Sequence, residues 1–179
     1  NLYAEALIKR IGHELTGDPG SWTNGAAALR MEIADRLGPE AAATTIISDG
    51  SGFSRGNRVE PATLTAWMRS VAGDPEIGQA FVDSLPTIGE GTLESRFQRT
   101  ATTNRVLGKS GTITGVRCLS GFVIHEPSGR RIAYSIMVNG LREGTEAPRN
   151  ALRLHEQIVG EIDQWLTRRV EAASANVGG

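Results

Sequence analysis

Residues 116–125, with the sequence VRCLSGFVIH, have the apolar and β-branched character of a buried β-strand. Residues 132–138, IAYSIMV, predict a second strand. The six residues between them, EPSGRR, are rich in turn formers and too few for a crossover, so we expect the two strands to pair antiparallel. After the strands, apolar side chains recur at helical spacing from Arg149 to Val170 and predict a long amphipathic helix.

The chain before these strands predicts mainly helices. Periodic apolar residues indicate helices over Leu2–Leu15 and Thr23–Leu37, and a third that begins at Pro61 and ends before Gly73. Residues 44–48 read as a short β-like run, and residues 77–108 as a short helix plus loop. A parallel sheet requires strands and helices to alternate along the chain, and here they do not. We therefore predict an α/β layered domain whose antiparallel sheet is flanked by helices, with the C-terminal helix on the sheet.

Length and composition limit the function classes. The 179 residues suit one domain, which we place at residues 1–171, followed by a flexible tail at 172–179. The net charge of −1, from 19 basic and 20 acidic residues, supplies no field for nucleic acid. No apolar run approaches the roughly 18 residues of a membrane span. Cys118 lies within an apolar strand and reads as a small buried hydrophobe.

The sequence Gly108-Lys109-Ser110-Gly111-Thr112 stands directly before the first strand. Lys109 is one of two lysines in a chain whose other basic residues are arginines. An ammonium, two hydroxyls and glycine-flanked backbone together suit a substrate carboxylate and a developing oxyanion. This stretch predicts the wall of an active site, or else a structural turn before a strand.

A phosphate-binding loop is the first alternative for this stretch, because Gly-Lys-Ser also ends the pattern G-x-x-x-x-G-K-[ST]. The first glycine of that pattern would fall at Thr103, and no helix follows Ile113. The sequence therefore disfavours nucleotide binding.

A second enzyme hypothesis starts from Gly52-Phe53-Ser54-Arg55-Gly56, which fits the nucleophile elbow G-x-S-x-G of α/β-hydrolases. Ser54 would be the nucleophile and His155 the base of an esterase. An elbow enters its helix at once, whereas the next predicted helix begins only near Pro61. The three histidines have no ligand-spaced partners, so we predict no metal and no cofactor.

Three strings resemble a known family in sequence and in order. They are Asp49-Gly50-Ser51-Gly52-Phe53-Ser54-Arg55-Gly56-Asn57, then Gly89-x-Gly91-Thr92-Leu93-x-x-Arg96, then Lys109-Ser110-Gly111-Thr112. They resemble the C-terminal part of penicillin-binding D-alanyl-D-alanine carboxypeptidases, specifically the carboxypeptidase/endopeptidase class of low-molecular-mass penicillin-binding proteins. Asn1 and the residues after it look like the end of that family's Ser-x-Asn motif. The resemblance implies a penicillin-binding, β-lactamase-like fold.

The resemblance also implies a serine DD-peptidase that cleaves peptidoglycan stem peptides through an acyl-enzyme and that β-lactams inhibit. The family's nucleophile is the serine of Ser-x-x-Lys. This chain has no such motif. The residue three positions before Lys9 is Ala6, and the residue three positions before Lys109 is Val106, so neither lysine follows a serine at the required spacing. We therefore expect the chain to be the C-terminal part of a longer enzyme whose N-terminal part supplies the nucleophile, with a processed second chain or a degenerate homologue as alternatives. The resemblance also implies that the enzyme is exported to the bacterial cell envelope.

The resemblance assigns roles to five residues near the reacting bond. Asn1 would hydrogen-bond the substrate amide and the active-site lysine, and Lys109 would set the electrostatics of the site. Ser110 and Thr112 would bind the terminal D-Ala carboxylate, with the Thr112 N–H as one oxyanion donor. Gly111 would let the substrate backbone lie against the strand edge.

The pocket for the stem-peptide side chain would be lined by Arg55, Ile113 and Thr114. A third hypothesis keeps the same fold without catalysis: a degenerate module that binds peptidoglycan peptides. The residues that decide between these hypotheses would lie upstream of Asn1.

Overall fold

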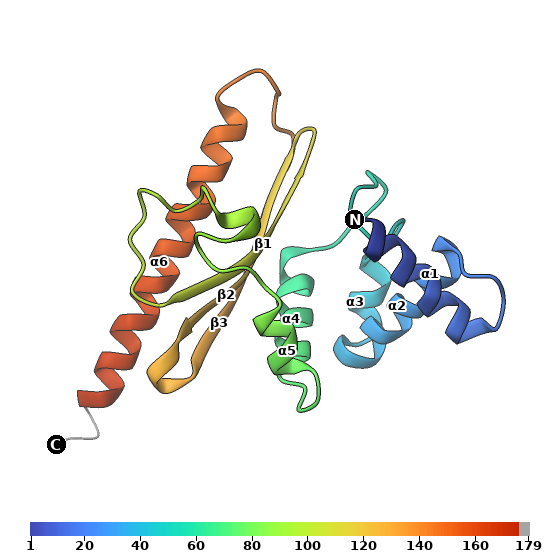
Figure 1. The fold of residues 1–179 in the computed structure, drawn as a ribbon, viewed down its shortest axis with the longest axis horizontal. Helices are drawn as coiled ribbons and strands as arrows, with labels where there is room; N and C mark the ends of the chain where they lie inside the picture. The colour runs from blue at the N-terminus through green and yellow to red at the C-terminus, as the bar shows by residue number, and fades with distance from the viewer. Residues whose placement is uncertain (176–179) are drawn as a thin grey trace. The chain divides into compact units, whose positions relative to one another are not determined.

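The computed structural model describes residues 1–175 and divides into two compact units (Figure 1). The first unit is Asn1–Ser70, and the second begins at Val71. The boundary lies in the last turn of helix α4 (Pro61–Ala72). Within residues 1–175, no helix is long and apolar enough to cross a membrane.

The first unit opens with three helices, α1 (Leu2–Thr16), α2 (Trp22–Leu37) and α3 (Pro39–Thr44). Helix α1 ends at Gly17, which has a φ of 73°. Helix α2 begins after Ser21, whose hydroxyl accepts the Asn24 N–H in a capping box. The predicted helices α1, α2 and α4 are therefore confirmed, each within about two residues of the expected start.

Helices α1 and α2 pack closely because glycines lie at their contact. A Cβ at Gly25 would lie 2.2 Å from the Ile8 carbonyl oxygen, and one at Gly12 would lie 2.5 Å from the Gly25 nitrogen. Any side chain at either position would push the helices apart.

The predicted β-like run at residues 44–48 is not a strand. Helix α3 extends to Thr44, and Ile46 then makes one isolated antiparallel bridge with Arg58. A single bridge is all that forms there, because helix α3 already includes the first residue of the run.

The second unit contains a three-stranded antiparallel sheet in the order β1-β2-β3. Its strands are β1 (Arg105–Ile113), β2 (Val116–His125) and β3 (Arg130–Val138). The bounds predicted for β2 are confirmed, and β3 begins two residues earlier than expected.

Strand β1 corrects the prediction of only two strands. The stretch expected to be loop up to Gly108, followed by the motif of Lys109, is a continuous nine-residue strand. Its glycines and polar residues carry little intrinsic strand preference, so its conformation comes from pairing with the apolar strand β2.

Helix α6 (Ala147–Ala175) lies along one face of the sheet (Figure 1). It is longer at both ends than the predicted Arg149–Val170, and the remainder of the predicted tail, residues 176–179, lies outside the described residues. Leu119 and Val123 of β2 are fully buried in one cluster with Val159 of α6. Each such side chain contributes roughly 1.5–3 kcal/mol by leaving water. The predicted layered α/β fold, with the C-terminal helix on an antiparallel sheet, is confirmed.

The opposite face of the sheet contacts helix α5 (Gly78–Asp83). The rings of Phe81 on α5 and Phe122 on β2 meet edge to face, with centroids 6.3 Å apart. The predicted short helix before the loop is therefore present, and β1 follows after a 3₁₀ turn (Gly91–Leu93).

Candidate active site on strand β1

Lys109 belongs to a row of polar side chains across the three strands. In register, Lys109 lies opposite Ser120 of β2, and Ser120 lies opposite Ser135 of β3. The two serine hydroxyls are 2.9 Å apart and hydrogen-bonded. Neither serine was predicted as a site residue, although each interrupts an apolar strand, which is a signal that the sequence does carry.

This row lies on the face of the sheet away from helix α6. Side chains alternate between faces along a strand, so Ser120 shares its face with Phe122, which contacts α5. Leu119, on the other face, is buried in the cluster with α6. Lys109 therefore occupies the α5 side of the sheet, beyond the Phe81–Phe122 contact.

The Lys109 side chain is exposed and bends to the outer edge of β1. Its Nζ donates a hydrogen bond of 2.6 Å to the carbonyl oxygen of Ser110. The ammonium is thus held beside the backbone of its own strand, where it can also meet an anion that approaches this edge.

The backbone at this edge is open from Lys109 onward. The N–H of Gly108 points outward, since it donates to the Pro86 carbonyl at 3.0 Å. Backbone groups in a strand alternate in direction, so the N–H groups of Ser110 and Thr112 point outward as well. Within the described residues, β2 is the only strand that pairs with β1 along the motif.

The motif residues Lys109 to Thr112 follow one another on strand β1, and Ile113 ends that strand. Lys109, Gly111 and Ile113 alternate with Ser110 and Thr112, so their side chains leave opposite faces. The outer edge is the place where an ammonium, hydroxyls and outward N–H groups can be reached at once. An extended peptide added beside β1 would meet them all.

The turn after the motif is held by the loop that leads into α6. Glu143 accepts the Gly115 N–H at 2.9 Å and pairs with Arg117 at 3.3 Å, and Leu141 N–H donates to the Gly115 carbonyl at 3.0 Å. The hydrogen bond from the Gly115 N–H lowers the pKa of Glu143, with Arg117 adding to it. Glu143 was not predicted from the sequence.

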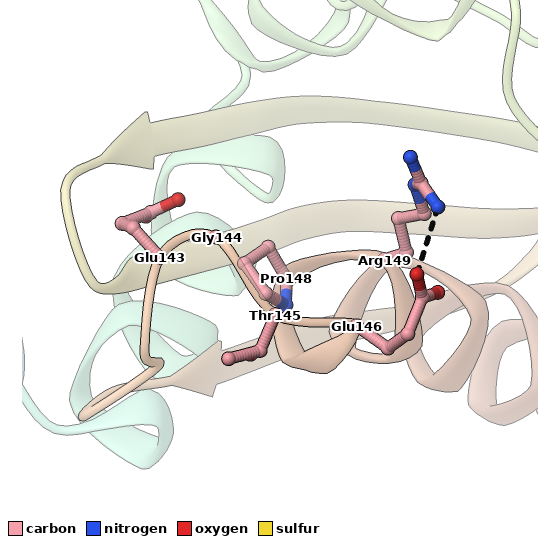
Figure 2. A pocket seen from close by; sticks show the side chains of 6 residues that line it. All are labelled: Glu143, Gly144, Thr145, Glu146, Pro148 and Arg149. Carbon is pink, nitrogen blue, oxygen red and sulfur yellow. Dashed lines mark hydrogen bonds and ion pairs between the residues drawn. The ribbon is translucent and has the colours of Figure 1, made fainter.

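The same loop forms an open pocket that contains none of the predicted site residues (Figure 2). It is lined by Glu143, Gly144, Thr145, Glu146, Pro148 and Arg149. Glu146 pairs with Arg149 at 2.9 Å, and Glu143 is occupied with the turn. Glu143 therefore serves the β1–β2 turn, and Glu146 pairs with the first turn of helix α6.

Asn1 and Arg55 belong to the first unit. Asn1 precedes α1, where its carbonyl accepts the Glu5 N–H at 3.0 Å and its side chain makes no capping hydrogen bond. Arg55 is exposed on the loop that follows Asp49, and its carbonyl accepts from the Arg58 guanidinium.

That loop is shaped by two carboxylates. Asp49 accepts the N–H groups of Gly52 and Ser54 and the amide of Asn57. Glu5 of α1 accepts the N–H groups of Gly50 and Ser51 and the indole N–H of Trp22. Hydrogen bonds from Ser51, Trp22 and Gly50 lower the pKa of Glu5 to about 2.

The geometry of Ser54 and His155 does not support the esterase hypothesis. The Ser54 hydroxyl accepts the Gly56 N–H within the loop, and the next helix starts only at Pro61. His155 is fully buried on α6. Burial, and then the Arg96 guanidinium, lower its pKa to about 4, so it is a poor base near neutrality.

The sequence matches the D-Ala-D-Ala carboxypeptidase 3 (S13) family over residues 1–162. This chain belongs to that family. It is 39% identical over 146 residues to a D-alanyl-D-alanine carboxypeptidase of Actinomadura sp. (strain R39), covering 78% of this chain and 26% of that relative. It is 27% identical over 147 residues to D-alanyl-D-alanine carboxypeptidase DacB of Haemophilus influenzae, covering 80% of this chain and 30% of the relative.

Solved structures share the fold of this chain. Penicillin binding protein 4 of Haemophilus influenzae, in a complex with a β-lactam, superposes with a TM-score of 0.74 at 24% identity, over 91% of this chain and 38% of that one. A second structure of that protein gives a TM-score of 0.71 at 25% identity, over 88% and 36%. The resemblance stated from the motifs is confirmed. The chain spans about a quarter to a third of the length of its curated relatives.

Proposed function

We propose that this chain supplies one wall of the active site of a serine-type D-Ala-D-Ala carboxypeptidase or endopeptidase. The observation that carries the proposal is that the Lys109 ammonium, bonded to the Ser110 carbonyl, and the outward N–H of Thr112 belong to the same open edge of β1. The S13 family and its carboxypeptidase relatives support the same activity. The substrate would be a peptidoglycan stem peptide ending in D-Ala-D-Ala.

The nucleophile would come from a Ser-x-x-Lys motif outside these 179 residues. Its serine oxygen attacks the carbonyl carbon between the two D-alanines, and its proton passes to the leaving amine as the C–N bond breaks. Water then hydrolyses the acyl-enzyme ester and restores the serine. A β-lactam would acylate the same serine.

Residues on β1 would stabilise the two negative charges of this reaction, the oxyanion and the substrate carboxylate. The Thr112 N–H would donate to the oxyanion, a contact worth about 3 kcal/mol in enzymes that use such donors. Lys109 would favour the substrate carboxylate electrostatically, and the hydroxyls of Ser110 and Thr112 would bind that carboxylate. Gly111 would leave room for the peptide backbone at the edge.

The resemblance gives roles to four further residues. By the resemblance to the family, Ile113 and Thr114, which follow the motif, and Arg55 would each take part in recognising the stem-peptide side chain. Asn1 would donate a hydrogen bond from its side-chain amide to the substrate. This reaction would need no cofactor. We also propose that the protein is exported to the bacterial envelope, because its substrate, peptidoglycan, lies there.

The decisive experiment measures the intact mass of the full-length protein with and without benzylpenicillin. We expect a covalent adduct of one penicillin, absent when the serine of Ser-x-x-Lys is replaced by alanine. Release of D-alanine from a D-Ala-D-Ala peptide would establish turnover. No adduct and no cleavage would contradict the proposal, whereas peptide binding without cleavage would favour the non-catalytic module.

A further inference from the structure

Tyr134 of β3 reaches across the sheet to the strand that carries the motif. Gly108, Gly121 and Tyr134 lie in one row across β1, β2 and β3. The Tyr134 side chain is buried, and its hydroxyl donates a hydrogen bond of 3.0 Å to the carbonyl of Leu107. Leu107 precedes Lys109 by two residues.

The two glycines make this reach possible. A Cβ at Gly108 would lie 2.7 Å from the Tyr134 hydroxyl oxygen, and one at Gly121 would lie 1.9 Å from the Leu107 oxygen. Neither glycine has a positive φ, so the need for glycine is one of space and not of backbone conformation. The tyrosine ring thus occupies the room that side chains would otherwise fill.

The same piece of backbone is held from its outer side. The Gly108 N–H donates to Pro86, and the Thr87 hydroxyl donates to the Val106 carbonyl at 3.0 Å. Residues 106–108 are therefore fixed from both edges, and the open edge begins at the next residue, Lys109. The position of this short stretch sets where the motif starts.

We propose that Tyr134 is a positioning residue for acylation, whose hydroxyl fixes β1 at Leu107 and thereby places Lys109 and the Thr112 N–H. This inference rests on the proposed function. Burial raises the pKa of Tyr134, so the hydroxyl stays protonated and remains a donor across the working pH range. Displacements of about 1 Å in such groups can cost about 100-fold in rate.

The test is Tyr134→Phe in the full-length protein, with pre-steady-state acylation by a chromogenic β-lactam. We expect the limiting acylation rate constant to fall roughly tenfold, with the dissociation constant of the non-covalent complex unchanged. Val159→Ala is the matched control, because Val159 lies in the same buried cluster but on α6. It should lower the melting temperature at least as much and leave the acylation rate unchanged.

Gly108→Ala supplies a second, independent test of the contact. Alone, its Cβ would displace the Tyr134 hydroxyl and slow acylation. In the Tyr134→Phe background that hydroxyl is gone, so the added loss from Gly108→Ala should shrink. Multiplicative effects of the two changes would contradict a direct contact between them.

The outcomes separate this inference from the proposed function. A wild-type protein that no β-lactam acylates would overturn both. If the wild type is acylated normally, two results would overturn the positioning role alone. One is an unchanged acylation rate in Tyr134→Phe. The other is an equal fall in the acylation rate in Tyr134→Phe and Val159→Ala at an equal fall in melting temperature.

Discussion

The carboxylate of Asp163, on helix α6, accepts the backbone N–H of Asn104 at 2.8 Å, one residue before β1 begins. It also accepts the N–H of Thr103 at 2.9 Å and the side-chain amide of Asn104 at 2.8 Å. Asp163 is 1% exposed. One buried carboxylate therefore ties the start of the motif strand to the helix behind the sheet.

Replacing Asp163 by alanine should destabilise the fold by roughly 3 kcal/mol, because it leaves buried donors without an acceptor. Chemical denaturation measures this change. Glu161→Gln is the control, since Glu161 is exposed on the same helix, and it should shift stability by less than about 0.5 kcal/mol. Equal effects of the two variants would contradict the anchoring role.

Replacing Glu143 by alanine should loosen the turn between β1 and β2. The Gly115 N–H loses its acceptor, so its amide hydrogen should exchange faster. Glu146→Ala is the matched control, because Glu146 lies in the same loop but pairs with Arg149 of helix α6. Since the pKa of Glu143 lies below its ordinary 4.5, the contribution of Glu143 to stability should be complete above pH 4.5 and fade as the pH falls further.

His155 should make the fold sensitive to mild acid. Its pKa is about 4 in the folded chain and 6.5 ordinarily, so the unfolded chain binds the proton more readily between these values. Stability should be complete above pH 6.5 and fall by up to about 3 kcal/mol towards pH 4. His155→Leu should flatten this dependence, whereas exposed His13→Gln should not. An unchanged slope in His155→Leu would contradict this account.

The apolar elements were predictable from sequence, and the motif strand was not. Strand β2 was predicted with its observed bounds because its apolar run is continuous. Strand β1 was missed because Gly108, Ser110 and Gly111 carry no strand signal, and its pairing with β2 makes it a strand. Helix α3 was missed because residues 39–44 are too few to show a period.

The candidate site was predictable only in part. The Lys109 motif was singled out by its residue types and then by its resemblance to a family; the comparison confirms that family, and the roles of the motif residues stay predictions. The supports of the motif were not found. Asp163 lies 59 residues from Asn104, and Tyr134 lies 27 residues from Leu107, so no local pattern connects them.

Thr112→Pro, compared with Thr112→Ala, which loses only the hydroxyl, should test the oxyanion donor while leaving the sheet paired. The Thr112 N–H points to the open edge, so its loss breaks no bond to β2, and proline is tolerated on edge strands. Acylation should fall by about 100- to 1,000-fold. Gly111→Pro is the contrasting control, because its N–H points towards β2 and its loss should unfold the strand.

Labelling of the full-length protein by a fluorescent penicillin, with Lys109 replaced by alanine, tests the central claim most directly. Lys109 is exposed, so Lys109→Ala should stay folded with an unchanged melting temperature and take up no label. Lys9→Ala, which removes the other lysine from its place over the Trp22 ring, is the control and should label normally. Normal labelling of Lys109→Ala would contradict the placement of this amine in the active site.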